Sequence, residues 1–283
     1  MLEDIPLVVA FIGSAICAVW DLKTTDIPDK VPYIMMAIGL LFWGVQSYVS
    51  GDYMLLASSA IAGLGLLGFG FLMYYFGQWG GGDAILLSAI GFLLPVAPQG
   101  FMQTFFPYPF SYTINVFIVG AAYMILYAVI IAARDKKIVS AFSHDLKASS
   151  KIISIGTLGL IGIFLAATVY MTNIFQIPLS SELVLAGVFL PAVATIGIYI
   201  VFKFAKSVEN VGFKKRIPVS KLKVGDVLLE SRLLEGINEK QLRKIRHSGK
   251  KFVWVKSGVP FVLAFPFALL VTLYIGDLLL VVI

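Results

Sequence analysis

Long apolar segments recur along nearly the whole chain, separated by short polar stretches. Runs of about 20 apolar residues are long enough to cross the hydrocarbon core of a bilayer as α-helices. The pattern predicts an all-α polytopic membrane protein with about eight transmembrane helices. Their expected ranges are 6–20, 31–49, 54–76, 84–96, 113–133, 152–171, 183–202 and 259–281. The first and fourth are short, and we expect each to extend through the aspartate beside it, Asp21 or Asp83.

The positive charges predict the orientation of these helices. With the N-terminus outside, the loops that face inward are 21–30, 77–83, 134–151 and 203–258, and all 22 Lys and Arg residues lie in them or at their edges. Cytoplasmic loops of membrane proteins carry an excess of Lys and Arg. We therefore expect a multi-pass protein of the cell membrane.

The composition agrees with a lipid bilayer as the main partner. The chain is 59% hydrophobic and 13% charged, whereas globular chains carry about 25% charged residues. We attribute the net charge of +6 to topology and to contact with anionic lipids. No basic patch is interleaved with aromatic residues, so nucleic acid is not an expected partner.

The chain divides into three expected parts. Residues 1–204 form a transmembrane helical bundle, 205–258 a small cytoplasmic α+β piece, and 259–283 a C-terminal transmembrane helix. Within the small piece we expect strands near 216–220, 224–229 and 252–255, and a helix over 238–246 with Asn238 as N-cap and Gly249 as stop. A piece of this size has a small core, so it is expected to dock on the bundle.

The residues that commonly bind metals are sparse. Cys17 is the single cysteine, and we interpret it as a small packing residue. His144 and His247 lie apart in different loops. The sequence therefore predicts no disulfide, no metal site and no cofactor.

Two aspartates at the ends of apolar segments are the candidate catalytic residues. Asp21 closes the first segment, and Asp83 follows three glycines just before the fourth. Placing a charged carboxylate at membrane depth costs free energy, so such a residue indicates a functional site. A negative charge at the C-terminal end of a helix opposes the helix dipole, so helix stability does not explain Asp21. Simpler interpretations are an interfacial aspartate opposite Lys23, and a helix N-cap at Asp83.

Glycines before Asp83 and in the preceding apolar segment could let a substrate backbone or a neighbouring helix come close. Gly80, Gly81 and Gly82 leave no side chains in the way, so the extended backbone of a substrate could approach. The preceding apolar segment contains small residues that let helices pack closely, namely Gly63, Gly65, Gly68 and Gly70. They either serve general packing or bring the helix after Asp83 against the helix before it.

These residues resemble the motifs of type IV prepilin peptidases. Asp21 followed by Ile27-Pro28-Asp29 is similar to the first aspartate motif of that family, and Gly80-Gly81-Gly82-Asp83 to its Gly-x-Gly-Asp signature. The end of the chain is similar to the C-terminal extension of archaeal members, in the runs Val224-Gly225-Asp226-Val227-Leu228, Gly236-Ile237-Asn238-Glu239 and Lys256-Ser257-Gly258-Val259-Pro260-Phe261-Val262. Bacterial members carry a four-cysteine loop that this chain lacks.

The resemblance implies a membrane-bound, metal-independent aspartic endopeptidase with Asp21 and Asp83 as the catalytic pair. Its substrates would be pilin-like or archaellin precursors, cut at the cytoplasmic face just before their hydrophobic helix. Two neighbouring carboxyl groups share a proton and titrate as a unit. Asp26 and Asp29 either pair with the basic leader of the precursor or belong to a solvated loop with Lys23 and Lys30.

Two other functions remain open at this stage. A presenilin-like intramembrane protease also uses a Gly-x-Gly-Asp motif, although a Tyr precedes the first aspartate there, where Trp20 stands here. An ion-coupled transporter could use the two aspartates for ion binding. A third carboxylate, Asp277, is expected near the outer end of the last helix, in an interfacial or helix-partner role rather than in catalysis.

Overall fold

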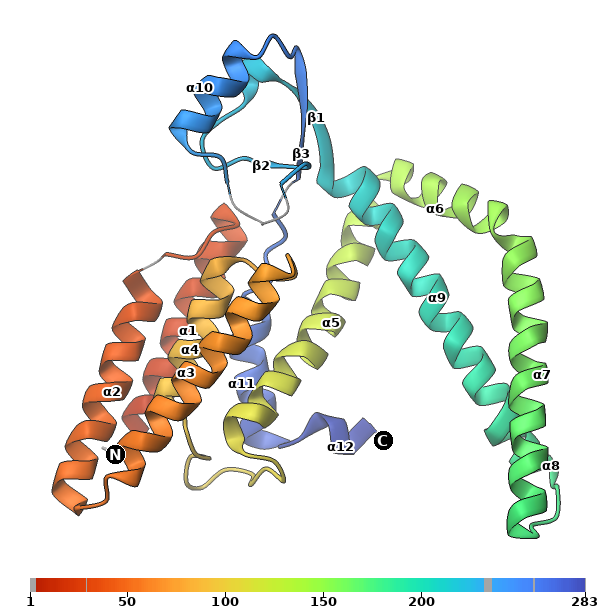
Figure 1. The fold of residues 1–283 in the computed structure, drawn as a ribbon, viewed down its shortest axis with the longest axis horizontal. Helices are drawn as coiled ribbons and strands as arrows, with labels where there is room; N and C mark the ends of the chain where they lie inside the picture. The colour runs from red at the N-terminus through yellow and green to blue at the C-terminus, as the bar shows by residue number, and fades with distance from the viewer. Residues whose placement is uncertain (1–3, 29, 232–235, 257, 283) are drawn as a thin grey trace. The chain divides into compact units, whose positions relative to one another are not determined.

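The computed structural model describes residues 4–28, 30–231, 236–256 and 258–282. It is mainly helical and falls into two compact units (Figure 1). One unit comprises Met1–Leu126 and Lys215–Ile283, and the other Tyr127–Lys214.

Helices α1 to α4 run side by side in the first unit (Figure 1). The N-terminal helices are α1 (Ile5–Thr24), α2 (Lys30–Ser50), α3 (Met54–Tyr75), α4 (Gly81–Leu93) and α5 (Tyr108–Arg134), the last of which continues into the second unit. α4 packs against both α2 and α3. Every residue of α4 from Leu86 to Leu93 is buried, so α4 is the central helix of this group.

Small residues let α3 and α4 approach closely. A Cβ added at Gly70 would lie 2.7 Å from the Ala84 Cα, and one added at Gly63 would overlap the Phe92 ring. The Ser88 Oγ donates to the Gly63 carbonyl at 2.8 Å. The interpretation that these glycines bring α4 against α3 is confirmed for Gly63 and Gly70. A Cβ at Gly65 or Gly68 would meet nothing within 4 Å.

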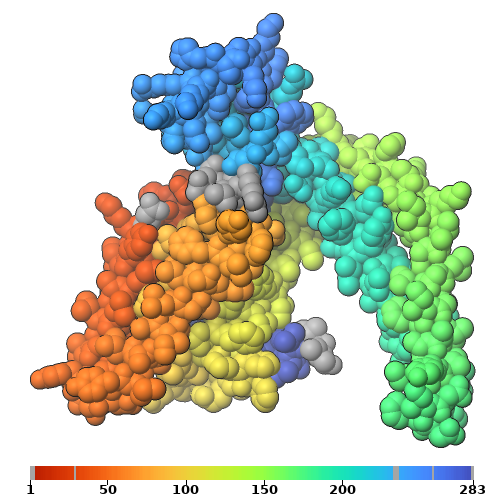
Figure 2. Space-filling view, in the orientation of Figure 1, coloured from red at the N-terminus to blue at the C-terminus, as the bar shows by residue number. Residues whose placement is uncertain are grey.

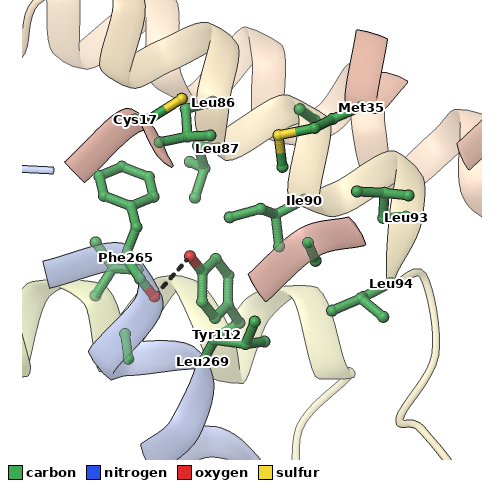
Figure 3. Packing of buried hydrophobic residues seen from close by; sticks show 14 of the residues in the cluster. Cys17, Met35, Leu86, Leu87, Ile90, Leu93, Leu94, Tyr112, Phe265 and Leu269 are labelled. Carbon is green, nitrogen blue, oxygen red and sulfur yellow. Dashed lines mark hydrogen bonds between the residues drawn. The ribbon is translucent and has the colours of Figure 1, made fainter. Parts of the chain in front are cut away.

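The core of the first unit lies between α1, α2, α4, α5 and α11 (Ala264–Tyr274). Figure 3 shows Cys17 and Leu86 facing Phe265, and the Tyr112 hydroxyl donating to the Phe265 carbonyl at 3.2 Å. Cys17 is fully buried, as the packing interpretation predicted. Segments from the two ends of the chain therefore share one core.

The second unit is a helical hairpin preceded by a helix that the sequence did not predict. Its helical elements are α6 (Lys136–Ala148), α7 (Ser150–Phe175), α8 (Ser181–Val184), the π-helix η2 (Leu185–Phe189), α9 (Leu190–Val208) and the π-helix η3 (Glu209–Phe213). α7 and α9 contact each other and converge at the end near α8 (Figures 1 and 2). We expected a loop over 134–151, but Asp135 accepts the Lys137 N–H at 2.9 Å and caps α6.

The strands and the helix of the small α+β piece lie close to their predicted positions, but residues 205–213, expected in this piece, form the end of α9 and η3. The elements of the piece are β1 (Lys214–Pro218), the 3-10 helix η4 (Val219–Lys221), β2 (Val227–Leu228), α10 (Glu239–His247) and β3 (Phe252–Lys256). The strand order is β1-β3-β2, and β2 pairs antiparallel with β3. Asn238 caps α10 by accepting the Gln241 N–H at 2.9 Å. Gly249, with φ +72°, follows the end of that helix, so both predicted boundaries are confirmed.

Six helices, not eight, are long and apolar enough to cross a membrane among the described residues. They support a multi-pass membrane protein, but the count of eight is not confirmed. α4 and α11 are apolar helices of 13 and 11 residues. α1 extends through Asp21 and α4 includes Asp83, as we expected for the two short segments.

The prediction of one continuous helix over 259–281 is wrong. The segment forms α11 and, after a break, α12 (Leu278–Val282). Gly276 lies in the break with φ +82°. The buried Asn115 of α5 stabilises this break, because its amide donates to the Gly276 carbonyl at 2.7 Å and its oxygen accepts the Leu278 N–H at 3.2 Å. Asp277 accepts the N–H of Phe105, which lies in the loop before α5, so this partner is a loop and not the helix of the expected helix-partner role.

We expect Asn115→Leu to destabilise this end of the first unit. The leucine has a similar volume but leaves the Gly276 carbonyl and the Leu278 N–H without their partner, at about 1–3 kcal/mol for each buried group. Thermal unfolding in detergent should show a lower Tm. Asn173→Leu on the exposed surface of α7 is the matched control, and an equal Tm for the two variants would contradict the prediction.

Candidate active site

Asp21 lies near the C-terminal end of α1 and is only 5% exposed. Its Oδ2 accepts the main-chain N–H of Val262 at 2.9 Å, a contact that spans 241 positions of sequence. α1 closes at Thr25, which has φ 55° and donates its N–H to the Asp21 carbonyl at 2.7 Å. Asp21 is therefore not the water-exposed interfacial aspartate of the simpler interpretation.

The chain after α1 turns back toward α4. Asp26 is exposed, and its Oδ1 accepts the Ile27 N–H at 2.9 Å. Ile27 is 8% exposed and packs in the core of the first unit. Asp29, the other acidic residue suggested for leader binding, lies outside the described residues. Asp26 also interacts electrostatically with Asp21, so the loop places negative charge beside the buried aspartate.

Asp83 is the third residue of α4 rather than its N-cap. Gly80 occupies the N-cap position with φ −75° and ψ 160°, and its N–H donates to the Asp83 Oδ2 at 2.9 Å. A carboxylate in the first turn of a helix is also favoured by the helix dipole. The N-cap interpretation was thus wrong by three positions, although Asp83 still stabilises the start of α4.

The three glycines before Asp83 differ in their surroundings. A Cβ at Gly82 would lie 2.9 Å from the Ile27 Cβ, so this glycine packs directly on the first motif. A Cβ at Gly81 would come no closer than 3.9 Å to Tyr74, and one at Gly80 would face only Asp83, at 3.3 Å. Gly82 thus has a packing reason, a Cβ at Gly80 would press on the Asp83 carboxylate, and only a Cβ at Gly81 would fit without a close contact.

The structure brings the two motif aspartates together. α1 and α4 pack against each other, and Asp21 interacts electrostatically with the half-buried Asp83. Each carboxylate also accepts a main-chain N–H. Two neighbouring carboxyl groups can hold one proton between them, one acting as acid and the other as base. Within the described ranges, no group of three or more His, Cys, Asp or Glu side chains is placed to hold a metal ion.

An aromatic cluster supports the turn that carries Asp83. Trp79 is 5% exposed and stacks on Phe117 of α5, with ring centroids 5.2 Å apart and planes at 20°. Its ring also lies 6.0 Å from Phe261 and 6.1 Å from Phe265. The position of Gly80 is therefore set by α5 and by the segment that enters α11.

The sequence did not reveal the roles of Phe261 and Val262 at this site. They belong to a run that was noted only for its similarity to archaeal peptidases. Gly258 and Pro260, just before an apolar segment, were the available signal, since this pair interrupts helix formation. Ser257 of the same run lies outside the described residues.

Comparison with known proteins supports a peptidase. Residues 8–134 match the profile of the type IV leader peptidase family, which confirms the resemblance seen in the motifs. A prepilin peptidase, EppA, of Methanothermobacter thermautotrophicus is 27% identical over 122 residues, which cover 40% of this chain and 32% of the relative. A preflagellin peptidase of Methanocaldococcus jannaschii is 34% identical over 91 residues, covering 32% of this chain and 38% of the relative. The matched part spans about a third of the length of each relative.

Proposed function

We propose that this chain, whose residues 8–134 match the type IV leader peptidase family, is a membrane-bound aspartic endopeptidase. It removes the basic leader from pilin-like or archaellin precursors. The observation that carries the proposal is the pairing of Asp21 and Asp83, which lie on different helices, interact electrostatically and both belong to the matched region. The match also favours this function over a presenilin-like protease or an ion-coupled transporter.

The proposed mechanism uses the two carboxyl groups as one catalytic unit. One carboxylate takes a proton from a water molecule, and the protonated partner polarises the scissile carbonyl. The water oxygen then adds to the carbonyl carbon, and the proton passes to the leaving amine. Because the unit must hold one proton, the rate should fall at both low and high pH. The chemistry calls for no metal and no cofactor.

The positive charges support a cytoplasmic active site. With the N-terminus outside, Lys23 and Lys30 lie in the same inward loop as Asp21, as the positive-inside rule favours. A precursor in the same membrane has its leader in the cytoplasm, next to the end of its hydrophobic helix. The scissile bond would then lie at the depth of Asp21 and Asp83.

Open space and negative charge near the aspartates suit a basic, extended peptide. A Cβ at Gly81 would come no closer than 3.9 Å to any neighbour, so this glycine leaves room beside the aspartates for a substrate backbone. Asp26 is exposed and carries its charge close to Asp21. We propose that Gly80, Gly81 and Gly82 form the wall along which the substrate backbone lies, with Gly82 also packed on Ile27, and that Asp26 and Asp29 attract the leader.

Asp26→Lys should lower kcat/KM for a precursor with a basic leader by roughly tenfold, since an attraction of about 0.2–1 kcal/mol per exposed pair becomes a repulsion. A precursor with an acidic leader should recover part of the loss. Cleavage assays with both precursors measure the effect, and Asp29→Lys should behave alike. Asp52→Lys, an exposed aspartate in the 50–53 loop, is the control. Equal loss with both leaders would rule out a charge pair.

The proposed function is tested by incubating purified protein with a pilin-type precursor that carries a basic leader. We expect one cut just before the hydrophobic helix, with the same rate in the presence of a metal chelator. Mass spectrometry of the products gives the position of the cut. A cut within the hydrophobic helix would favour the presenilin-like alternative. Absence of cleavage across precursors with basic leaders would contradict the proposal.

A further inference from the structure

We infer that residues 258–262, just before α11, form a positioning segment that holds both halves of the active site. Its main chain binds Asp21, and its aromatic side chain supports the turn before Asp83. The segment lies outside residues 8–134, the part that matches the family profile. The inference rests on the proposed function for its catalytic consequence, but the contacts that carry it are independent of that function.

The first contact is the hydrogen bond between Val262 and Asp21. The Val262 N–H donates to the Asp21 Oδ2 at 2.9 Å, and both residues are buried, at 1% and 5% exposure. The main-chain N–H of Phe261 interacts with the same carboxylate. Hydrogen bonds to a carboxylate are stronger than those between neutral groups. The segment therefore determines which way the Asp21 side chain points.

The second contact is at the end of α1. A Cβ on Gly258 would lie 2.9 Å from the Thr25 Cβ and 3.0 Å from its hydroxyl, so the Thr25 side chain packs directly on the main chain of Gly258. Thr25 is the left-handed residue that ends α1, through its bond to the Asp21 carbonyl. The segment thus contacts the end of α1 at two places, the carboxylate of Asp21 and the side chain of Thr25, the residue that caps the helix.

The third contact links the segment to the turn that carries Asp83. The Phe261 ring packs where Gly120 of α5 has no side chain, since a Cβ there would lie 2.6 Å from the ring. The same ring lies 6.0 Å from Trp79 and 6.1 Å from Phe265. Because Trp79 immediately precedes Gly80, the segment that binds Asp21 also supports the turn of Asp83. The separation of the two carboxyl groups therefore depends on residues 258–262.

The Val262 N–H can be removed without breaking the local fold. The Phe261 carbonyl accepts the Ala264 N–H at 3.0 Å, so Val262 is the second residue of a turn, a position where proline is favoured. Its N–H serves Asp21 and is not needed by α11. Val262→Pro removes the hydrogen bond and places its ring Cδ where the amide hydrogen pointed at Asp21, so the Asp21 side chain must also turn away. Val262→Ala keeps the N–H and removes part of the buried side chain.

Kinetics of precursor cleavage separate the two effects. We expect Val262→Pro to lower kcat by about tenfold to a hundredfold, the equivalent of one hydrogen bond to a charged group, with KM nearly unchanged. Val262→Ala should keep kcat within about threefold of the wild type. If Val262→Ala loses as much activity as Val262→Pro, the side chain rather than the N–H is responsible, and the inference is wrong.

A spectroscopic readout tests the contact without activity. In protein labelled with ¹⁵N-valine in detergent micelles, the Val262 amide signal is assigned by its loss in Val262→Leu. We expect this amide proton to lie downfield and to move upfield in Asp21→Asn, because the charged acceptor is gone. An unchanged signal would overturn the inference even if the enzyme cleaves its substrate. A shifted signal in a protein that cuts nothing would support the contact and reject the proposed function.

Discussion

Asp21→Asn and Asp83→Asn should each lower kcat for precursor cleavage by at least about a thousandfold. Each change removes one member of a pair that must act as acid and base, and such groups contribute about 10²–10⁴-fold to a rate. The double variant should be hardly slower than either single variant, since the two residues act as one unit. Single-turnover cleavage with excess enzyme measures the residual rates.

Both variants should remain folded, because an asparagine oxygen can still accept the hydrogen bonds that the aspartates accept now. The amide oxygen in Asp21→Asn would keep the Val262 N–H as donor, and the one in Asp83→Asn would keep the Gly80 N–H. Asp52→Asn is the matched control, since Asp52 is exposed and its side chain likewise accepts a main-chain N–H, that of Met54. If Asp21→Asn or Asp83→Asn cuts at the rate of Asp52→Asn, the aspartates are not the catalysts.

Gly70→Leu should destabilise the first unit and inactivate the enzyme together. Its Cβ would lie 2.7 Å from the Ala84 Cα, so α3 and α4 must separate. Overpacking of this kind costs typically about 1–3 kcal/mol, and more where backbone must move. Ala84 is the neighbour of Asp83, so the displacement would also move the catalytic carboxyl group. The Tm in detergent and the cleavage rate should therefore fall together.

Gly68→Leu on the same helix provides the control. A Cβ at Gly68 would meet nothing within 4 Å, so a leucine there faces open space and should leave the Tm and the cleavage rate nearly unchanged. The two variants differ only in the face of α3 that carries the leucine. If both lower the Tm equally, the loss reflects the glycine itself and not the packing of α4.

Local signals in the sequence were sufficient for much of the architecture. Apolar runs of about 20 residues predicted α1, α2, α3, α5, α7 and α9, because the length needed to cross a bilayer can be counted along the chain. The cap at Asn238 and the glycine at Gly249 predicted the boundaries of α10, because residues that start and stop a helix lie next to it in the sequence. The motif around Gly80 to Asp83 indicated a resemblance to a peptidase family, and the profile of the type IV leader peptidase family matches residues 8–134.

Prediction failed where the deciding contact is distant in sequence. An apolar run over 259–281 looks like one helix, yet Asn115 binds the carbonyl of Gly276, 161 positions away, and stabilises a break. The run that forms α4 was predicted only as a short span, and its sequence did not show that eight consecutive residues would be buried by neighbouring helices. α6 was missed because its polar composition resembles that of a loop.

In the candidate site, too, local features could be predicted from the sequence, whereas contacts between distant residues could not. The sequence by itself was sufficient for the long apolar helices and for choosing Asp21, Asp83 and the glycines beside them as candidates, since residue type and spacing are local properties. Only the tertiary structure decided that Ile27 packs on Gly82 and that the Val262 N–H binds Asp21. A main-chain N–H carries no sequence signature, and a contact across 241 positions depends on how the helices pack.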